Sequence, residues 1–410
     1  MQENELIPHL FRTEFRKIVA VLCKHLGIDH IQTAEDIAGE TFLLAYETWS
    51  YKGIPGNPVP WLYTVAKNKA KNHLARYHIF TKKISPQLQQ EAANTTEPEI
   101  DLSDRNITDS QLQMLFAICD PVLSTEAQVG LALRILCGFG VDEIANAFLT
   151  SKETINKRLF RAKEKLRAAK MPIAFPPAAE INKRIESVLT TLYLLFSEGY
   201  YSESCDTVLR NDFCVEAMRL NYLLIENEAT NLPAVNALFA LMCFHASRFE
   251  ARKNRSGEMV LYEDQDETLW NKELIEKGIY FLHQASTGDQ ASKYHIEANI
   301  AFWHTVKEDS AEKWENILQL YNYLLQIEYS PIAALNRTYA LARANGIEQA
   351  IAEAEKLDLS TNHFYFTLLG ELYQDLDPHK AVSHLETAYQ LAKTNTDKQT
   401  IFKKMHALRK

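Results

Sequence analysis

A cluster of basic and polar side chains between residues 150 and 170 has the chemistry needed to bind DNA. Lysine and arginine neutralise phosphates, and both can also hydrogen-bond to base edges in the major groove, as asparagine does. Four apolar residues recur among them at helical spacing, namely Ile155, Leu159, Ala162 and Leu166. A helix here would bury that stripe and expose its other faces. The residues that we expect to face DNA are Ser151, Lys152, Glu153, Thr154, Asn156, Lys157, Arg158 and Arg161.

Two short helices joined by a tight turn must position this cluster. The first has one apolar face, made by Val141, Ile144, Ala145 and Phe148. Ser151 is placed to cap the second helix, and Glu153 is favourable near its positive end. A helix packed across a second, basic helix is typical of the helix-turn-helix, which inserts the second helix into the major groove. The alternative is an amphipathic pair inside an all-helical protein, with its lysines in solvent.

A second group of side chains, between residues 49 and 76, combines aromatic rings with positive charge. Trp49, Tyr51 and Trp61 lie around the segment 51–60, which contains three prolines and which we expect to be a loop. The helix predicted over 61–77 has a polar side that includes Lys67, Asn68, Lys71, Asn72 and Arg76. Cations for the backbone and aromatic faces for unstacked bases are what single-stranded nucleic acid needs. The alternative is that the tryptophans anchor a core and the lysines are solvated.

Three segments, in this order, resemble regions 2 and 4 of bacterial sigma factors of the extracytoplasmic-function (ECF) subfamily, within the sigma-70 family. They are AEDIAGETFLLAYETW at 34–49, PVPWLYTVAKNKAKNHLAR at 58–76 and the helix-turn-helix at 139–169. The resemblance implies that the 34–49 helix binds core RNA polymerase through Asp36, Glu40 and Phe42. Gly39 departs from the family, which usually has glutamine there.

The same resemblance assigns the two groups of side chains to promoter DNA. It implies that the aromatic and basic group at 49–76 captures the non-template strand of the minus-ten element. It also implies that the second helix of the helix-turn-helix binds the minus-thirty-five element as duplex.

Charge is divided unevenly along the 410 residues, whose net charge is −9. Residues 1–170 carry 21 basic and 20 acidic side chains, whereas residues 171–410 carry 23 and 33. The acidity therefore belongs to the second part and does not oppose DNA binding by the first. The six cysteines form no CxxC pair, which favours buried thiols in a reducing compartment. Without a signal peptide or an apolar run that could span a bilayer, we expect a cytoplasmic protein that does not enter the membrane.

Residues beyond about 171 extend past the usual end of such sigma factors. One subgroup of the family has a long helical extension, which this sequence resembles at 195–203, 261–275, 294–304 and 330–346. Near the end, seven residues recur at the spacing of a tetratricopeptide repeat (TPR) from which one residue is deleted. They are Phe366, Leu369, Gly370, Tyr373, Ala381, Leu385 and Ala388, and a looser copy of the repeat covers 333–357. We expect stacked helix pairs with a concave surface for a protein or peptide. A generic helical bundle is the alternative.

Together these observations predict an all-α protein with five parts. They are sigma region 2 at 1–80, an acidic linker at 81–110, the region 4 helix-turn-helix at 111–171, a proline-rich linker at 172–185 and a TPR-like domain at 186–410. The acidic residues at 263–266 match no EF-hand loop, and Asp266 is better placed as a helix cap than as a metal ligand. We expect no metal, no cofactor and no enzymatic activity.

Two functions are compatible with this pattern. The first is a sigma factor that binds core RNA polymerase and promoter DNA, with a helical extension that regulates or assists it. The second is a helix-turn-helix transcription regulator whose TPR-like domain senses a peptide, and which does not bind the polymerase as a sigma subunit. The 34–49 helix and the aromatic and basic group favour the first, because a simple regulator needs neither.

Overall fold

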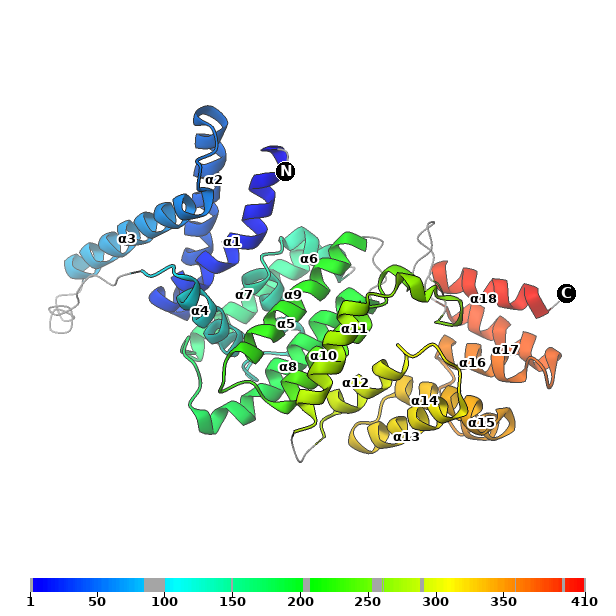
Figure 1. Ribbon diagram of the computed structural model, residues 1–410. Coiled ribbons are helices and arrows are strands. Elements are labelled where there is room, and N and C mark those ends of the chain that lie inside the picture. Colours follow the sequence, from blue (N-terminus) through cyan, green and yellow to red (C-terminus); the bar gives the residue numbers. More distant parts are fainter. Residues whose placement is uncertain are drawn as a thin grey trace. The chain divides into compact units, whose positions relative to one another are not determined.

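The structure, a computed structural model, describes residues 3–84, 100–148, 150–201, 207–252, 260, 262–287, 291–357, 359–392 and 395–408. These residues form helices α1 to α18 and no strand, which confirms the predicted all-α class (Figure 1). The chain divides into two compact units, Met1–Thr230 and Asn231–Lys410. Within the described residues, no helix combines the length and the apolar character that a membrane span requires.

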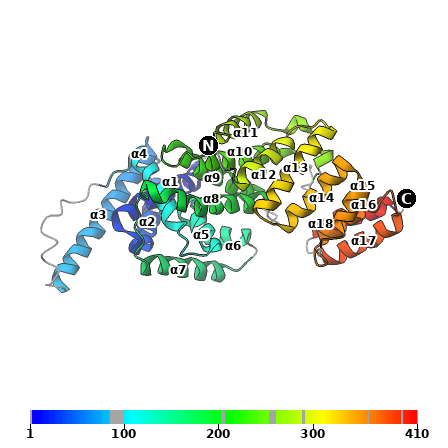
Figure 2. The ribbon, with the colours of Figure 1, turned by 90° about the horizontal axis from the view of Figure 1, so that it is seen from below.

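The first unit contains α1 to α9. Their bounds are α1 Glu3–Leu26, α2 Ile31–Lys52, α3 Pro58–Ile84, α4 Asp104–Ile118, α5 Thr125–Leu131, α6 Val141–Ala147, α7 Lys152–Ala168, α8 Ala178–Tyr201 and α9 Thr207–Glu226. A π-helical segment, Ala132–Leu136, continues α5. Figures 1 and 2 show α3 as a long helix that leaves α1 and α2 along its second half.

The loop between α2 and α3 is shorter than the predicted segment 51–60. Helix α2 ends at Lys52 and is capped by Gly53, whose positive φ of 78° suits glycine and whose N–H donates to the Trp49 carbonyl. Helix α3 then begins at Pro58, so Pro58 and Pro60 lie in its first turn. Proline is tolerated there because first-turn N–H groups have no intrahelical partner.

The buried stripe of α2 includes a residue that was predicted to contact core polymerase. Phe42 is buried, whereas Leu44 is 37 % exposed. Phe42 shares helical spacing with the buried residues Ala38, Ala45 and Trp49, and this spacing fixes the inner face. Edge-to-face packing on Phe11 of α1, with ring centroids 5.1 Å apart, holds the Phe42 ring in the core.

Both predicted linkers are partly helical. Helix α4 begins at Asp104, N-capped by Ser103, instead of near residue 112, and most of the acidic stretch, 85–99, lies outside the described residues. Helix α8 begins at Ala178, directly after Pro177, within the predicted linker 172–185. Its side chains Val188 and Leu192 are fully buried in the first unit. The α8–α9 hairpin therefore belongs to the same unit as the sigma-like segments.

The second unit is a series of helices in which sequential neighbours pair. Their bounds are α10 Pro233–Ala246, α11 Lys272–Ala285, α12 Lys293–Trp303, α13 Ala311–Ile327, α14 Pro331–Asn345, α15 Ile347–Ala354, α16 His363–Tyr373, α17 Pro378–Leu391 and α18 Asn395–Leu408. Helices α16 and α17 approach closely at Gly370, one of the positions of the predicted repeat spacing, because a Cβ atom there would lie 2.6 Å from Leu385 Cγ on α17. Gly278 on α11 is equally tight, with a Cβ position 2.5 Å from Phe244 Cε1.

The described cysteines are buried free thiols, as predicted. They are Cys23, Cys119, Cys137, Cys214 and Cys243, whereas Cys205 lies outside the described residues. Burial raises the pKa of Cys119 and of Cys243 to about 12. A thiol with so high a pKa holds almost no thiolate at neutral pH, so these cysteines pack as small apolar residues.

Candidate nucleic-acid interface

Helix α7 begins with the predicted cap. The Ser151 side chain accepts a hydrogen bond from the Thr154 N–H, and Glu153 lies exposed in the first turn. The predicted apolar stripe of Ile155, Leu159, Ala162 and Leu166 is buried. This burial turns the polar faces of the helix outward, so most of the predicted DNA contacts are exposed: Ser151, Lys152, Glu153, Thr154, Asn156, Lys157 and Arg161.

Two residues of α7 differ from expectation. Arg158 is only half-exposed, because its guanidinium carbon lies 5.8 Å from the ring centroid of Phe148 in the preceding turn. Phe160, which is not among the predicted DNA contacts, is 66 % exposed, and Asn156 and Lys157 one turn before it are also exposed. Its absence from the apolar stripe is the sequence signal that could have identified it. An exposed aromatic on such a surface can contact a thymine methyl group.

The aromatic and basic group forms one surface at the junction of α2 and α3. Trp49 is buried and packs edge-to-face on Trp61, with ring centroids 5.3 Å apart. Tyr51 is 92 % exposed at the end of α2. On α3, Lys67 is half-exposed, and the other predicted contacts are exposed, namely Asn68, Lys71, Asn72 and Arg76. Trp49 is therefore an anchor of this surface, while Tyr51 and the α3 residues are open to a ligand.

A pocket of about 450 Å³ adjoins the α3 surface. Tyr63, Thr64 and Lys67 line it from α3, and residues 100–103 line it from the segment before α4. The carboxylate of Asp101 accepts hydrogen bonds from the backbone and side chain of Ser103, which lower its pKa, and the charge of Lys67 lowers it further. An acidic group thus lies near one of the cations predicted to contact DNA.

Helix α2 presents an exposed stripe of mixed character. The predicted contacts Asp36 and Glu40 are exposed, and Glu40 pairs with Lys69 of α3 at 2.7 Å. The third predicted contact, Phe42, is only 4 % exposed and lies in the core, whereas its neighbour Leu43 is 57 % exposed. Tyr46 is exposed one turn further on. Glu40 lies four residues after Asp36, and Leu43 lies three residues after Glu40, so the three share one face of the helix. This spacing is the sequence signal that could have identified Leu43 instead of Phe42.

Helix α7 is bonded to the start of α2. Glu35 of α2 is buried and forms ion pairs with Lys163 of α7 and, at 2.9 Å, with Arg134 of the π-helical segment. Arg167 of α7 also donates to the Asp29 carbonyl, 3.0 Å away. These contacts join the start of α2 to the second half of α7 within one unit.

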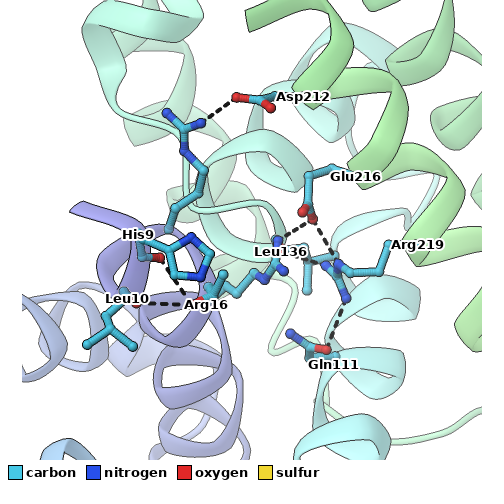
Figure 3. A network of polar contacts seen from close by, with 10 residues as sticks. His9, Leu10, Arg16, Gln111, Leu136, Asp212, Glu216 and Arg219 are labelled. Carbon is cyan, nitrogen blue, oxygen red and sulfur yellow. Dashed lines mark hydrogen bonds and ion pairs between the residues drawn. The ribbon is translucent and has the colours of Figure 1, made fainter. Parts of the chain in front are cut away.

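A buried polar network joins α9 to α1, to α4 and to the π-helical segment (Figure 3). Glu216 of α9 forms ion pairs with Arg16 of α1 and, at 2.8 Å, with Arg219. Arg219 in turn donates to the Gln111 side chain of α4 at 3.2 Å and to the Leu136 carbonyl at 2.9 Å. Arg16 and Glu216 are both buried. Breaking either partner of such a pair leaves the other as a buried, uncompensated charge.

Further contacts tie the α8–α9 hairpin to the same segments. Arg12 of α1 pairs with Asp212 of α9, and the ring of Phe139 packs on Phe213 of α9 with centroids 4.5 Å apart. On α8, Arg184 donates to the Phe116 carbonyl at 2.7 Å, and Ser187 donates to the Cys119 carbonyl at 2.6 Å. The hairpin is thus a brace across α1, α4 and the π-helical segment.

Family models match two parts of the chain. Residues 10–78, which include α2 and most of α1 and α3, match sigma-70 region 2. Residues 184–286 match a family of unknown function, DUF6596. The second match begins inside α8, so it includes most of the hairpin that braces the first unit.

Two curated proteins resemble the chain. The uncharacterized protein R00370 of Rhizobium meliloti (strain 1021) is 32% identical over 354 residues, which cover 85% of this chain and 83% of that protein. The RNA polymerase sigma-H factor of Pseudomonas aeruginosa is 25% identical over 188 residues, or 42% of this chain and 95% of that factor. No solved structure matches the chain significantly.

Proposed function

We propose that this chain, which belongs to the same family as the Rhizobium meliloti protein and carries a sigma-70 region 2, is a sigma factor of the ECF subfamily. It would bind core RNA polymerase and direct it to a specific set of promoters. The observation that carries the proposal is the region 2 match over 10–78. Those residues form α2, with its exposed stripe of Asp36, Glu40, Leu43 and Tyr46, and most of α3, with its surface of Lys67, Asn68, Lys71, Asn72 and Arg76. A regulator that binds duplex DNA alone needs neither surface.

Each exposed surface has one role in this proposal. The α2 stripe of Asp36, Glu40, Leu43 and Tyr46 binds core polymerase, with two acidic side chains followed by two largely apolar ones. Tyr51 and the exposed α3 residues bind the single-stranded minus-ten element, where Tyr51 offers a face for an unstacked base. The exposed face of α7 binds the minus-thirty-five duplex in the major groove.

The arrangement of the first unit is too compact for both promoter elements at once. Lys157 lies about 9 Å along α7 from Lys163, and Trp49 lies about 21 Å along α2 from Glu35. Since Lys163 and Glu35 are paired, Lys157 and Trp49 are less than about 45 Å apart. The two elements are centred roughly 25 base pairs apart, or about 85 Å of B-DNA. Region 2 and region 4 must therefore separate before both elements can be bound.

This requirement gives the α8–α9 hairpin a regulatory role. Its contacts with Arg12, Arg16, Gln111 and Leu136 hold the two regions in the compact arrangement. We infer that the hairpin restrains the sigma factor until the hairpin is released. The helix pairs of the second unit, which we interpret as TPR-like, would bind the protein or peptide that controls this release.

Transcription in vitro tests the proposal. Purified chain is added to core polymerase with genomic promoter fragments, and start sites are mapped. We expect initiation at defined sites that is absent with core polymerase alone. If the chain instead binds duplex DNA specifically but never associates with core polymerase, it is a transcription regulator and not a sigma factor.

Alanine substitutions on α7 test the duplex-binding surface. Lys157→Ala and Arg161→Ala should each weaken minus-thirty-five binding, by about 1–3 kcal/mol where the side chain contacts a base. Lys165→Ala is the matched control, because Lys165 is an exposed lysine of the same helix outside the proposed surface. Promoter affinity and polymerase affinity are measured separately, and only the first should change. Equal losses from all three variants would mean that the duplex contacts extend along the helix and are not confined to the proposed residues.

A further inference from the structure

In the second unit, three cationic side chains converge on the ring of Tyr262, and neither proposed DNA surface involves them. The guanidinium carbon of Arg248, which follows α10, lies 5.4 Å from the centroid of that ring. The Nζ atoms of Lys307 and Lys313 lie 5.8 Å and 5.1 Å from it. Cations at these distances are attracted by the ring quadrupole, although they repel one another.

Two more aromatic rings and a fourth cation extend the group. Trp270 stacks beside Tyr262, with ring centroids 6.3 Å apart, and lies 5.9 Å from Lys307 Nζ. Trp314 lies 5.5 Å from Lys313 Nζ and 5.3 Å from the guanidinium carbon of Arg343. We call this set the basic–aromatic cluster: Arg248, Tyr262, Trp270, Lys307, Lys313, Trp314 and Arg343. It draws on two sequence segments singled out above, 261–275 and 330–346, which the proposed function left unexplained.

Two of the four cations, Arg248 and Lys313, have no carboxylate partner among the described residues. Lys313 is 1 % exposed and donates only to neutral groups, the Tyr262 hydroxyl at 2.9 Å and the Val306 carbonyl at 2.6 Å. Asp309 forms its ion pair with Arg343.

The ionisation of neighbouring groups reflects this positive potential. Burial lowers the pKa of Lys313, and the charges of Arg248, Arg343 and Lys307 lower it further against the opposing effect of Asp309. Burial, with Arg248 and Lys313, also lowers the pKa of His304 to about 3. Both shifts disfavour positive charge, because burial and the neighbouring cations outweigh the single Asp309 carboxylate, which pairs with Arg343 and accepts from Trp314 Nε1.

Two buried donors in the cluster have no hydrogen-bond partner among the described residues. They are Nε of Arg248, a residue that is 7 % exposed, and Nε1 of the buried Trp270. A buried N–H without an acceptor is destabilising, because it has lost its hydrogen bonds to water without a replacement. Both residues lie beside the Tyr262 ring, so an acceptor-rich anion bound there would offer acceptors to such donors and charge opposite to that of Arg248 and Lys313.

We propose that the basic–aromatic cluster binds a phosphate group, either as the free anion or as part of a small phosphorylated molecule. A doubly charged group with several acceptor oxygens matches two unpartnered donors among several cations better than a carboxylate does. The group is small because the cluster is largely buried. The partly exposed Arg343 and Lys307 mark the side from which it enters.

Binding of inorganic phosphate to the full-length chain tests the site. Calorimetry and thermal unfolding are followed at constant ionic strength, with sodium chloride as reference, acetate as the carboxylate probe and phenyl phosphate as the organic probe. We expect phosphate to bind and to raise the unfolding midpoint above that in chloride, and acetate to do so less. Tighter binding of phenyl phosphate would identify the source as a phosphorylated molecule, and weaker binding would identify the free anion.

Charge-removing variants locate the site. Arg248→Gln should weaken phosphate binding about tenfold or more, because one charged hydrogen-bond donor is lost. Arg337→Gln is the matched control, since Arg337 bonds to Asn322 at 2.6 Å, outside the cluster, and it should leave binding unchanged. Lys307→Gln gives an independent second variant if Arg248→Gln fails to fold.

The proposal is overturned if phosphate protects no better than chloride, or if the variants that fold bind it as tightly as the unmodified chain. Because the measurement uses the chain alone, either result leaves the sigma-factor proposal standing.

Discussion

Replacing Glu216 with glutamine should increase transcription from the chain's own promoters, because it breaks the brace between α9 and the two sigma regions. The substitution leaves Arg16 buried without its counter-charge, which costs about 3–5 kcal/mol in comparable buried pairs. Release of α9 from α1 avoids that cost by exposing Arg16 to water. The open arrangement, in which both promoter elements can be bound, should therefore be more populated.

The measurement pairs transcription in vitro with the separation of α2 and α7, reported by fluorescent labels on exposed positions of the two helices. Both should increase together in Glu216→Gln. The control is Glu273→Gln, which removes a carboxylate from the exposed pair with Lys277 and should change neither quantity. Circular dichroism establishes that the variant remains helical.

Two results would contradict the restraint. If the helices separate but transcription falls, the compact arrangement assists the sigma factor instead of restraining it. If neither quantity changes, the network has no regulatory role. Glu35→Gln provides a second route, because it removes the carboxylate that pairs with Lys163 and Arg134 between α2 and region 4.

A double substitution of Leu43 and Tyr46 by aspartate should abolish binding to core polymerase. Both side chains are largely exposed on the α2 stripe, so the change should not disturb the core of the first unit. In an interface, however, it would bury two carboxylates without partners, at a cost of several kcal/mol. Affinity for core polymerase, measured by co-purification and by fluorescence anisotropy, should fall by at least roughly a hundredfold.

Matched aspartates elsewhere separate this effect from a general loss of stability. Tyr323 and Ile327 are exposed to a similar degree on α13, and their double replacement should leave polymerase affinity unchanged. Phe42→Ala is informative in another way. Because Phe42 packs on Phe11 in the core, this variant should lose stability, by about 3–5 kcal/mol, instead of a polymerase contact. Retained polymerase binding by the Leu43 and Tyr46 variant would move the polymerase surface away from this stripe.

Local patterns in the sequence determined much of the first unit. The stripe from Ile155 to Leu166 fixed which face of α7 is buried, and Ser151 fixed where the helix begins, because helical periodicity and N-capping act within a few residues. The division of charge between residues 1–170 and 171–410 also needed only the sequence. In the same way, Gly370 marked a close helix approach, since a glycine at that spacing leaves room for the facing Leu385.

The sequence was less decisive where several faces of a helix look alike. In α2, Leu44 and Phe42 are both apolar, and only packing against Phe11 decided that Phe42 lies inside. The prolines at 58 and 60 suggested a loop, although the first turn of α3 accommodates them. In these places the local preference is weak, and contacts with other helices choose between the alternatives.

Only the tertiary structure revealed the contacts between distant segments. Arg16 and Glu216 are 200 residues apart, and so are Arg12 and Asp212, yet both pairs join α1 to α9. Arg248, Lys313 and Arg343 likewise come from separate segments and meet around two aromatic rings. A sequence shows that such side chains are charged but not which of them share a site, because their partners are chosen by the packing of whole helices. The sequence thus determined the helical class and the faces of helices with a clear apolar stripe, such as α7, whereas the tertiary structure decided the brace and the cluster.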